Sequence, residues 1–346
     1  MANDNEELSD SQQNVSPQIE GLLPPGMVEQ LSSGSYQGML SFGKFPYLTE
    51  PEQLDAFNPD VAVVGAPYDA NVSNRPGARF GPQALRSRYY HPGTYSIDLG
   101  IEIFDHLVCV DYADAICSAG MWEESRQAIF NRVHEVVSRN IFPVVIGGDH
   151  SVAVPSVSAV AEHYGKGKVG MIHFDAHADT GEIVDGNLYS HGTPMRRLIE
   201  SGTVSGKNFI QIGLRGYWPG EKEFSWMKEQ GMRWHTMNDI WEHGIKSVLE
   251  KAIEQANDGT DYVYLSIDVD SIDPAFAPGT GTPEPGGFTP VDILRCVRRI
   301  SQEVNLVGMD VVEVSPPYDV ADNTVNIAHR LVWELLSGLA IKKRDS

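Results

Sequence analysis

The strongest constraint on the fold is an alternation of short apolar runs with helix-like segments from residue 61 almost to the end of the chain. The apolar runs are predicted to be buried strands, and they span 61–65, 142–146, 169–174, 208–214, 262–267 and 306–309. The segments predicted to be helices span 83–88, 123–138, 155–163, 246–256, 290–301 and 324–338. This alternation is typical of a parallel sheet covered by helices on both faces.

The domain organisation follows from what interrupts this pattern. Residues 1–44 are rich in Ser, Gln, Asn, Gly and Pro, which predicts a loosely ordered arm. Alternatively, this arm packs on a neighbouring subunit or over a site. The rest of the chain has no internal repeat and no long polar linker, so we expect a single α/β domain over residues 45–346.

The acidic composition excludes some classes of partner. The chain has 26 Lys and Arg against 47 Asp and Glu, a net charge of −21 that repels nucleic-acid phosphates. It has no apolar run of roughly 18 residues that would cross a membrane. The acidic N-terminus lacks the basic and apolar parts of a signal peptide. The three cysteines of the chain, Cys109, Cys117 and Cys296, are too few for a disulfide framework, so we expect a cytoplasmic protein.

Three predicted strands end directly in residue types that bind metals. The segments are Gly147–Ser151, His173–Asp179 and Ser266–Asp270. Each alone could be a capped polar turn. However, the carboxyl ends of parallel strands meet at one edge of a sheet, so we expect all three to lie together. Because alternate residues of an extended chain share a face, Asp175, His177 and Asp179 can converge on one point.

The charge of this group indicates the number of ions. The four carboxylates are Asp175, Asp179, Asp268 and Asp270, and the neutral imidazoles are His150 and His177. One divalent ion would leave two negative charges unbalanced, whereas two ions would neutralise all four carboxylates. A bridging hydroxide would then leave one negative charge, which favours a cationic substrate. Mixed Asp and His ligands suit Mn²⁺, Ni²⁺, Fe²⁺ or Co²⁺ better than Ca²⁺ or a thiolate-rich zinc site, and two metals lower the pKa of bridging water.

These motifs resemble the ureohydrolase family, which includes arginase, agmatinase and guanidinobutyrase. The resemblance extends from about Asp60 to Gly338, and residues 266–283 are especially similar to agmatinase and guanidinobutyrase. It implies a three-layer α/β/α fold with a mainly parallel sheet and a binuclear metal cluster. By position, one metal would be held by His150, Asp175, Asp179 and Asp268. The other would be held by Asp175, His177, Asp268 and Asp270, so that Asp175 and Asp268 bridge the ions.

The resemblance also implies three catalytic roles in hydrolysis of a guanidinium group by hydroxide. Asp270 would stabilise the tetrahedral intermediate. His191 matches a loop histidine that protonates the leaving amine; alternatively it is a turn histidine bound to backbone. Glu313 would hold the guanidinium by two parallel hydrogen bonds; alternatively it is a surface carboxylate.

The substrate is harder to predict. Segments 91–95 and 214–218 resemble a nickel-dependent branch that hydrolyses free guanidine. Thr94 and Trp218 are expected to bind substrate and, with Tyr217, to narrow the pocket, although the aromatic pair could instead belong to a core or interface. Guanidine is therefore the favoured substrate. Agmatine and 4-guanidinobutyrate are close competitors, and a metformin-type biguanide hydrolase is a further alternative.

Two other functional classes remain as alternatives. A non-catalytic subunit of a hetero-oligomer would be expected to lose metal ligands, and none is missing here. A related deacetylase fold holds one zinc with an Asp-x-His pair, whereas Asp268, Asp270 and Asp179 argue for two metals. The resemblance further implies a homo-oligomer, either a trimer or a hexamer, and a metal-delivery chaperone if the metal is nickel.

Overall fold

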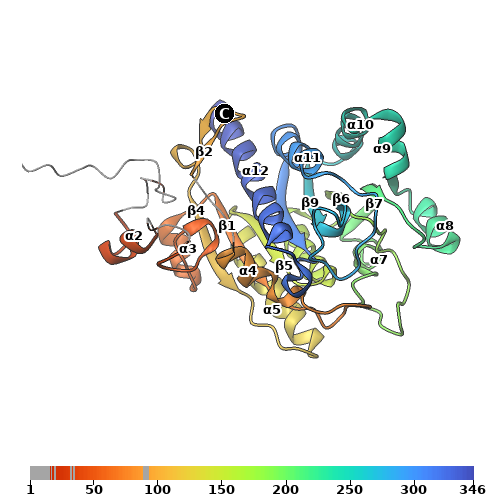
Figure 1. Ribbon diagram of the computed structural model, residues 1–346, viewed down its shortest axis with the longest axis horizontal. Coiled ribbons are helices and arrows are strands. Elements are labelled where there is room, and N and C mark those ends of the chain that lie inside the picture. The colour runs from red at the N-terminus through yellow and green to blue at the C-terminus, as the bar shows by residue number, and fades with distance from the viewer. Residues whose placement is uncertain (1–15, 17, 19–20, 32, 34–35, 89–92) are drawn as a thin grey trace, which may run out of the picture.

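The computed structural model describes residues 16–346 except 17, 19–20, 32, 34–35 and 89–92. The described part is built on a central eight-stranded sheet in which all neighbouring strands pair in parallel (Figure 1). In spatial order the strands are β4 (Cys109–Asp114), β1 (Val61–Ala66), β5 (Phe142–Gly147), β10 (Leu306–Val312), β9 (Tyr262–Asp268), β6 (Val169–Phe174), β7 (Val204–Leu214) and β8 (Arg233–Thr236).

Helices cover both faces of this sheet. One face packs against α4 (Gly81–Ser87), α9 (Met237–His243), α10 (Ile245–Asn257), α11 (Pro290–Glu303) and α12 (Asn323–Asp345). The other face packs against α3 (Pro51–Phe57), α5 (Trp122–Val137), α6 (Ala153–Tyr164), α7 (Pro194–Glu200) and α8 (Glu221–Glu229). The predicted three-layer α/β/α class is therefore confirmed.

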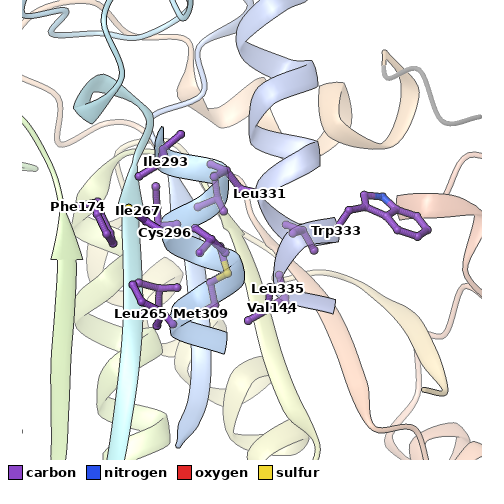
Figure 2. Packing of buried hydrophobic residues seen from close by; sticks show 14 of the residues in the cluster. Val144, Phe174, Leu265, Ile267, Ile293, Cys296, Met309, Leu331, Trp333 and Leu335 are labelled. Carbon is purple, nitrogen blue, oxygen red and sulfur yellow. The ribbon is translucent and has the colours of Figure 1, made fainter. Parts of the chain in front are cut away.

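Alternation along the strands explains the two cores. In β9, Val263 and Leu265 contribute to one core, whereas Tyr264 between them contributes to the other. Successive side chains of a strand point to opposite faces, so a strand covered on both sides is apolar throughout. Figure 2 shows the first core, in which Ile293 and Cys296 of α11 pack over the strands beside Leu331 and Leu335 of α12.

The packed domain begins before residue 45. Phe42 is buried, its N–H donates to the Asp111 carboxylate at 2.7 Å, and its ring stacks on His329. Lys44 is also buried and donates to the carbonyl of Met39 at 2.9 Å. Upstream, α2 (Pro25–Leu31) buries Leu31 in a small separate cluster. The expected arm also covers residues 1–15, which lie outside the described residues, so its role stays a prediction.

The sequence prediction missed several elements. The short strands β4 and β8 form the two edges of the sheet, and α7, α8 and α9 lie in connections for which the sequence predicts no helix. A small antiparallel hairpin, β2 (Tyr95–Ser96) with β3 (Ile101–Glu102), was missed as well. No helix in the described ranges combines the length and apolarity needed to span a membrane.

Candidate metal centre and substrate cavity

Four adjacent strands in the middle of the sheet bring the predicted site residues to one edge. His150 follows β5, Asp175, His177 and Asp179 follow β6, Asp268 ends β9 with Asp270 two residues later, and Glu313 follows β10. The loop after β5 passes directly against the loop after β1. A Cβ on Gly148 would lie 1.7 Å from the carbonyl oxygen of Tyr68, so only glycine fits this close approach.

His150 faces three carboxylates. Its Nδ1 lies 3.2 Å from Asp175 Oδ2, 3.1 Å from Asp179 Oδ2 and 3.2 Å from Asp268 Oδ2. Its Nε2 lies 2.9 Å from Ser266 Oγ, and that hydroxyl donates its only proton to Asp310. Ser266 must then accept the Nε2 proton, so Nδ1 is the nitrogen that faces the three carboxylates. These carboxylates outweigh the effect of burial and raise the pKa of His150 well above its usual range, and in the neutral ring Nδ1 carries the lone pair. A cation placed between these four groups would satisfy all of them.

A second group shares Asp175 with the first. His177 Nδ1 lies 3.0 Å from Asp270 Oδ2 and 3.6 Å from Asp175 Oδ1. One ligand atom from each of these three residues falls within 4.8 Å of the others, the spacing of a metal site. The backbone holds the carboxylates in place, because Ala176 N–H donates to Asp270 and Asp270 N–H donates to Asp268.

The electrostatics of this cluster fit a divalent cation. Burial, with repulsion from neighbouring carboxylates, raises the pKa of Asp268 well above its usual range and that of Asp175 to about 6. Although burial opposes it, nearby Asp270 raises the pKa of His177 to about 11. Four buried carboxylates and two imidazoles with no thiolate form a donor set suited to divalent transition-metal ions.

Two residues that support this centre had not been predicted. His173 is buried, its Nε2 lies 2.9 Å from Asp175 Oδ2, and its Nδ1 lies 3.0 Å from the Gln211 side-chain nitrogen. Its position two residues before Asp175, on the same strand face, was the available signal. Arg215 donates to the carbonyl of Asp270 at 2.6 Å. Such contacts orient metal ligands.

His191 and Glu313 meet beside this cluster, although the chain separates them widely. His191 Nδ1 lies 2.8 Å from Glu313 Oε1, and its Nε2 lies 2.7 Å from Ser73 Oγ. Burial lowers the pKa of His191, but the Glu313 charge outweighs it and raises that pKa to about 9. The raised pKa favours the protonated imidazole, whereas the Ser73 N–H that donates to Nε2 at 3.0 Å requires a lone pair there, so the two ring states are held close in energy. Ser73 was not predicted, because no local pattern links its loop to His191.

Glu313 has one oxygen in use and one free. Oε1 accepts from His150 N–H at 2.8 Å as well as facing His191, whereas buried Oε2 has no hydrogen-bond partner among the described residues. The predicted pair of parallel hydrogen bonds to a guanidinium would therefore have to share Oε1, and Oε2 is the open acceptor. Glu313 and Asp179 also adopt left-handed backbone conformations, with φ of 63° and 52°. Such strain in non-glycine residues concentrates at functional sites.

A cavity of about 380 Å³ lies beside these groups, and buried Glu313 is not among the described residues that line it. Its polar lining comes from Ser73, His177, Asp179, Asp185, His191, Asp268 and Thr282. Its remaining lining comes from Val184, Gly192 and Trp218. Trp218 packs at the mouth, with its ring centre 6.1 Å from that of His177. A larger surface hollow of about 470 Å³ lies between β8, α9 and α10, and none of the predicted site residues lines it.

Besides Glu313, two predicted pocket residues do not line this cavity. Thr94 lies beside the β2–β3 hairpin and accepts from Ile103 N–H, and this hairpin lies near the C-terminal end of α12 (Figure 1). The last turns of α12 reach Asp60, just before β1, through Lys343. This is the side of the sheet where the strands begin, whereas the metal ligands lie where the strands end. Tyr217 is fully exposed, because it points away from the domain while Trp218 turns inward.

Comparison with known proteins agrees with this architecture. The model of the arginase family matches residues 59–338. The chain is 38% identical to the mitochondrial agmatinase of Gallus gallus, covering 86% of this chain and 85% of the relative. It is 35% identical to a guanidinobutyrase of Pseudomonas aeruginosa, covering 87% and 92%. The solved structure of proclavaminate amidinohydrolase from Streptomyces clavuligerus superimposes with a TM-score of 0.80 at 36% identity, covering 89% of this chain and 99% of that chain. The chain therefore belongs to the arginase family.

Proposed function

We propose that this chain hydrolyses a C–N bond of a small guanidinium compound, releasing urea and an amine or ammonia. The observation that carries the proposal is the juxtaposition of the buried Asp and His donor set with Glu313, whose second oxygen is free. The names of the relatives, agmatinase and guanidinobutyrase, support the same reaction class.

The metal ligands we propose are those named from the sequence. His150, Asp175, Asp179 and Asp268 would hold one ion, and Asp175, His177, Asp268 and Asp270 would hold the other. The lone pair on His150 Nδ1 and the shared position of Asp175 support this division. When bound, two divalent ions would supply hydroxide near neutral pH and neutralise the four carboxylates. We propose Mn²⁺ or Ni²⁺, because both accept mixed nitrogen and oxygen ligands.

The protein's own residues would position the substrate and deliver a proton. Glu313 Oε2 would accept an N–H of the guanidinium in a charge-assisted hydrogen bond. Asp270 would stabilise positive charge on the attacked carbon's nitrogens. His191 would hold the proton that the departing nitrogen takes up. Ser73 Oγ, which contacts His191 Nε2 and also lines the cavity, could pass that proton to the leaving group.

The cavity admits more than guanidine. Thr94 and Tyr217 lie outside it, which removes two of the three residues expected to narrow the pocket, and Trp218 alone remains. Guanidine stays a candidate as the smallest substrate. The volume of about 380 Å³ also accommodates a guanidino compound with a short tail, such as agmatine or 4-guanidinobutyrate. A homo-oligomer, a cytoplasmic location and, for nickel, a delivery chaperone are further proposals.

A substrate panel tests the reaction class. The chain loaded with Mn²⁺ or Ni²⁺ would be assayed for urea and ammonia release from guanidine, agmatine, 4-guanidinobutyrate, 3-guanidinopropionate, arginine and metformin. Asp268→Asn serves as the inactive control, and we expect it to lose turnover. Metal counting should give about two ions per chain; one would support the deacetylase alternative and none the non-catalytic subunit. Release from none of these compounds would refute the proposal.

A further inference from the structure

The rim of the cavity carries a carboxylate that the proposed chemistry does not use. Asp185 lines the cavity together with the proposed ligands Asp179 and Asp268, but it lies on the exposed rim rather than in the buried cluster. The distal part of any bound guanidino compound would lie toward this rim, since the guanidinium must reach the buried ligands.

The backbone fixes Asp185 in place. Val184 and Asn187 exchange two backbone hydrogen bonds of 3.2 Å and 2.9 Å, which closes a two-residue hairpin turn. The turn residues Asp185 and Gly186 have φ of 51° and 78°, the left-handed geometry that an Asp-Gly pair favours. The acidic side chain is therefore held at the rim by a turn whose geometry it suits.

A second set of contacts ties this turn to the site. The Asn187 amide donates to Asn71 Oδ1 at 3.0 Å, and Asn71 N–H donates to the buried Asp149 at 3.0 Å. The Asn71 carbonyl also accepts from His191 N–H at 2.9 Å. The hairpin is thus joined to the loops that carry His150 and His191, so Asp185 keeps a fixed relation to the reacting groups.

The basic side chains that line the cavity are His177 and His191, and each faces a carboxylate other than Asp185, on Asp270 and Glu313 respectively. Among the described residues that line it, none is Lys or Arg. The Lys or Arg residues nearest Asp185 in sequence, Arg196 and Arg197, pair with Glu200, and Arg197 also donates to the carbonyls of Glu182 and Leu188. Other basic residues are engaged as well. Arg215 donates to backbone carbonyls, Lys222 pairs with Glu182, and Arg75 lies over the Tyr318 ring at 5.3 Å. A substrate carboxylate at the rim would therefore meet a negative charge and no partner.

We infer that Asp185 is a specificity-determining residue that selects guanidino compounds whose tail is absent or cationic and rejects those that carry a tail carboxylate. The inference rests on the proposed function and narrows its substrate class. It sets this chain apart from the guanidinobutyrase that it resembles, because the name of that relative denotes an acidic substrate.

Agmatine and 4-guanidinobutyrate form a matched pair for the test, since they are similar in length and opposite in tail charge. We expect the wild-type chain to favour agmatine over 4-guanidinobutyrate in kcat/KM. Asp185→Asn keeps the turn preference and removes the charge. It should lower kcat/KM for agmatine about two- to fivefold and raise that for 4-guanidinobutyrate by a similar factor, as for one exposed ion pair. Guanidine, which has no tail, should change less than about twofold.

Two controls keep the outcome interpretable. Glu182→Gln makes the same charge change on the same loop, but its side chain faces Lys222 and does not line the cavity, so it should leave the ratio unchanged. Asp185→Gly also suits the left-handed turn and should reproduce the effect of Asp185→Asn. The preference should weaken in 0.5 M salt because exposed charges are screened.

Binding separates failure of the inference from failure of the proposed function. Calorimetric titration of the metal-loaded chain with each compound should show tighter binding of agmatine even without turnover. Turnover or binding of 4-guanidinobutyrate equal to that of agmatine, or an unchanged ratio in Asp185→Asn, would overturn the inference. Preferential binding of agmatine without urea release would uphold the selection while refuting the proposed reaction.

Discussion

The free oxygen of Glu313 makes the sharpest prediction, for the variant Glu313→Gln. The amide keeps an Oε1 that can accept from His150 N–H and face His191 Nδ1, both at 2.8 Å, so the local structure should persist. In the variant, however, an NH₂ donor replaces the acceptor Oε2. It would face the N–H donors of the proposed guanidinium substrate and could not accept a hydrogen bond from them. A hydrogen bond to a charged group contributes about 1.5–3 kcal/mol. Its loss corresponds to a fall in kcat/KM of roughly 10- to 150-fold.

The same variant should change the proton held by His191. Glu313 is the main group that raises the pKa of this imidazole to about 9. A folded-state pKa above the unfolded value contributes stability below pH about 6.5, and this contribution is lost as the pH rises through about 9. Glu313→Gln removes the contribution. The variant should therefore be less stable than wild type at pH 6 and approach it at pH 9.

The assay is urea release with metal content measured on the same samples, alongside thermal unfolding at pH 6 and pH 9. Glu303→Gln on the exposed end of α11 is the matched control, and we expect no change in turnover. The reasoning would be refuted if Glu313→Gln kept kcat/KM within about threefold of wild type at equal metal content.

Three further predictions concern the proton, the metals and the fold. His191→Asn should reduce turnover roughly 100-fold with little change in metal content, and unchanged turnover in this variant would rule out the proton role. In wild type, activity should decline near pH 9, where His191 loses its proton. Removal of metal by a chelator should abolish urea release and lower the melting temperature, with recovery on adding Mn²⁺ or Ni²⁺; full activity without metal would contradict the proposed centre. Arg86→Ala should destabilise the chain by about 3–5 kcal/mol in denaturant unfolding, because it strands buried Asp111, whereas Arg139→Ala at an exposed pair should cost less than about 1 kcal/mol.

The elements that the sequence predicted are those with a clear local pattern. The central strands β5, β6 and β9 are buried on both faces and read as continuous apolar runs, and α10 and α11 place apolar residues at helical spacing. The edge strand β8 is only four residues long and partly exposed, and α7 is a short helix that begins at Pro194. Short or half-exposed segments carry too few apolar positions to show a period, so the sequence predicts neither element.

Among the predicted site residues, too, those at strand ends were easier to place than those in connecting loops. The proposed metal ligands lie at strand ends, and parallel strands bring such ends to one edge by geometry alone. Thr94 and Tyr217 lie in connections whose path depends on packing. Neither reaches the cavity, whereas adjacent Trp218 does. Resemblance of a loop segment says which residues are present, but it does not say which way each side chain turns.

The sequence by itself determined the α/β class, the parallel sheet and the types of residue at its carboxyl edge, because hydrophobic period and strand-end position are local properties of the chain. Only the tertiary structure decided which oxygen of Glu313 lacks a partner among the described residues, and that Ser73 meets His191 across 118 positions. It also decided that Asp185 stands at the rim of a cavity whose described lining includes no Lys or Arg. These relations follow from strand order and from contacts between segments more than a hundred residues apart. No local pattern encodes such contacts, since they exist only after the sheet has brought those segments together.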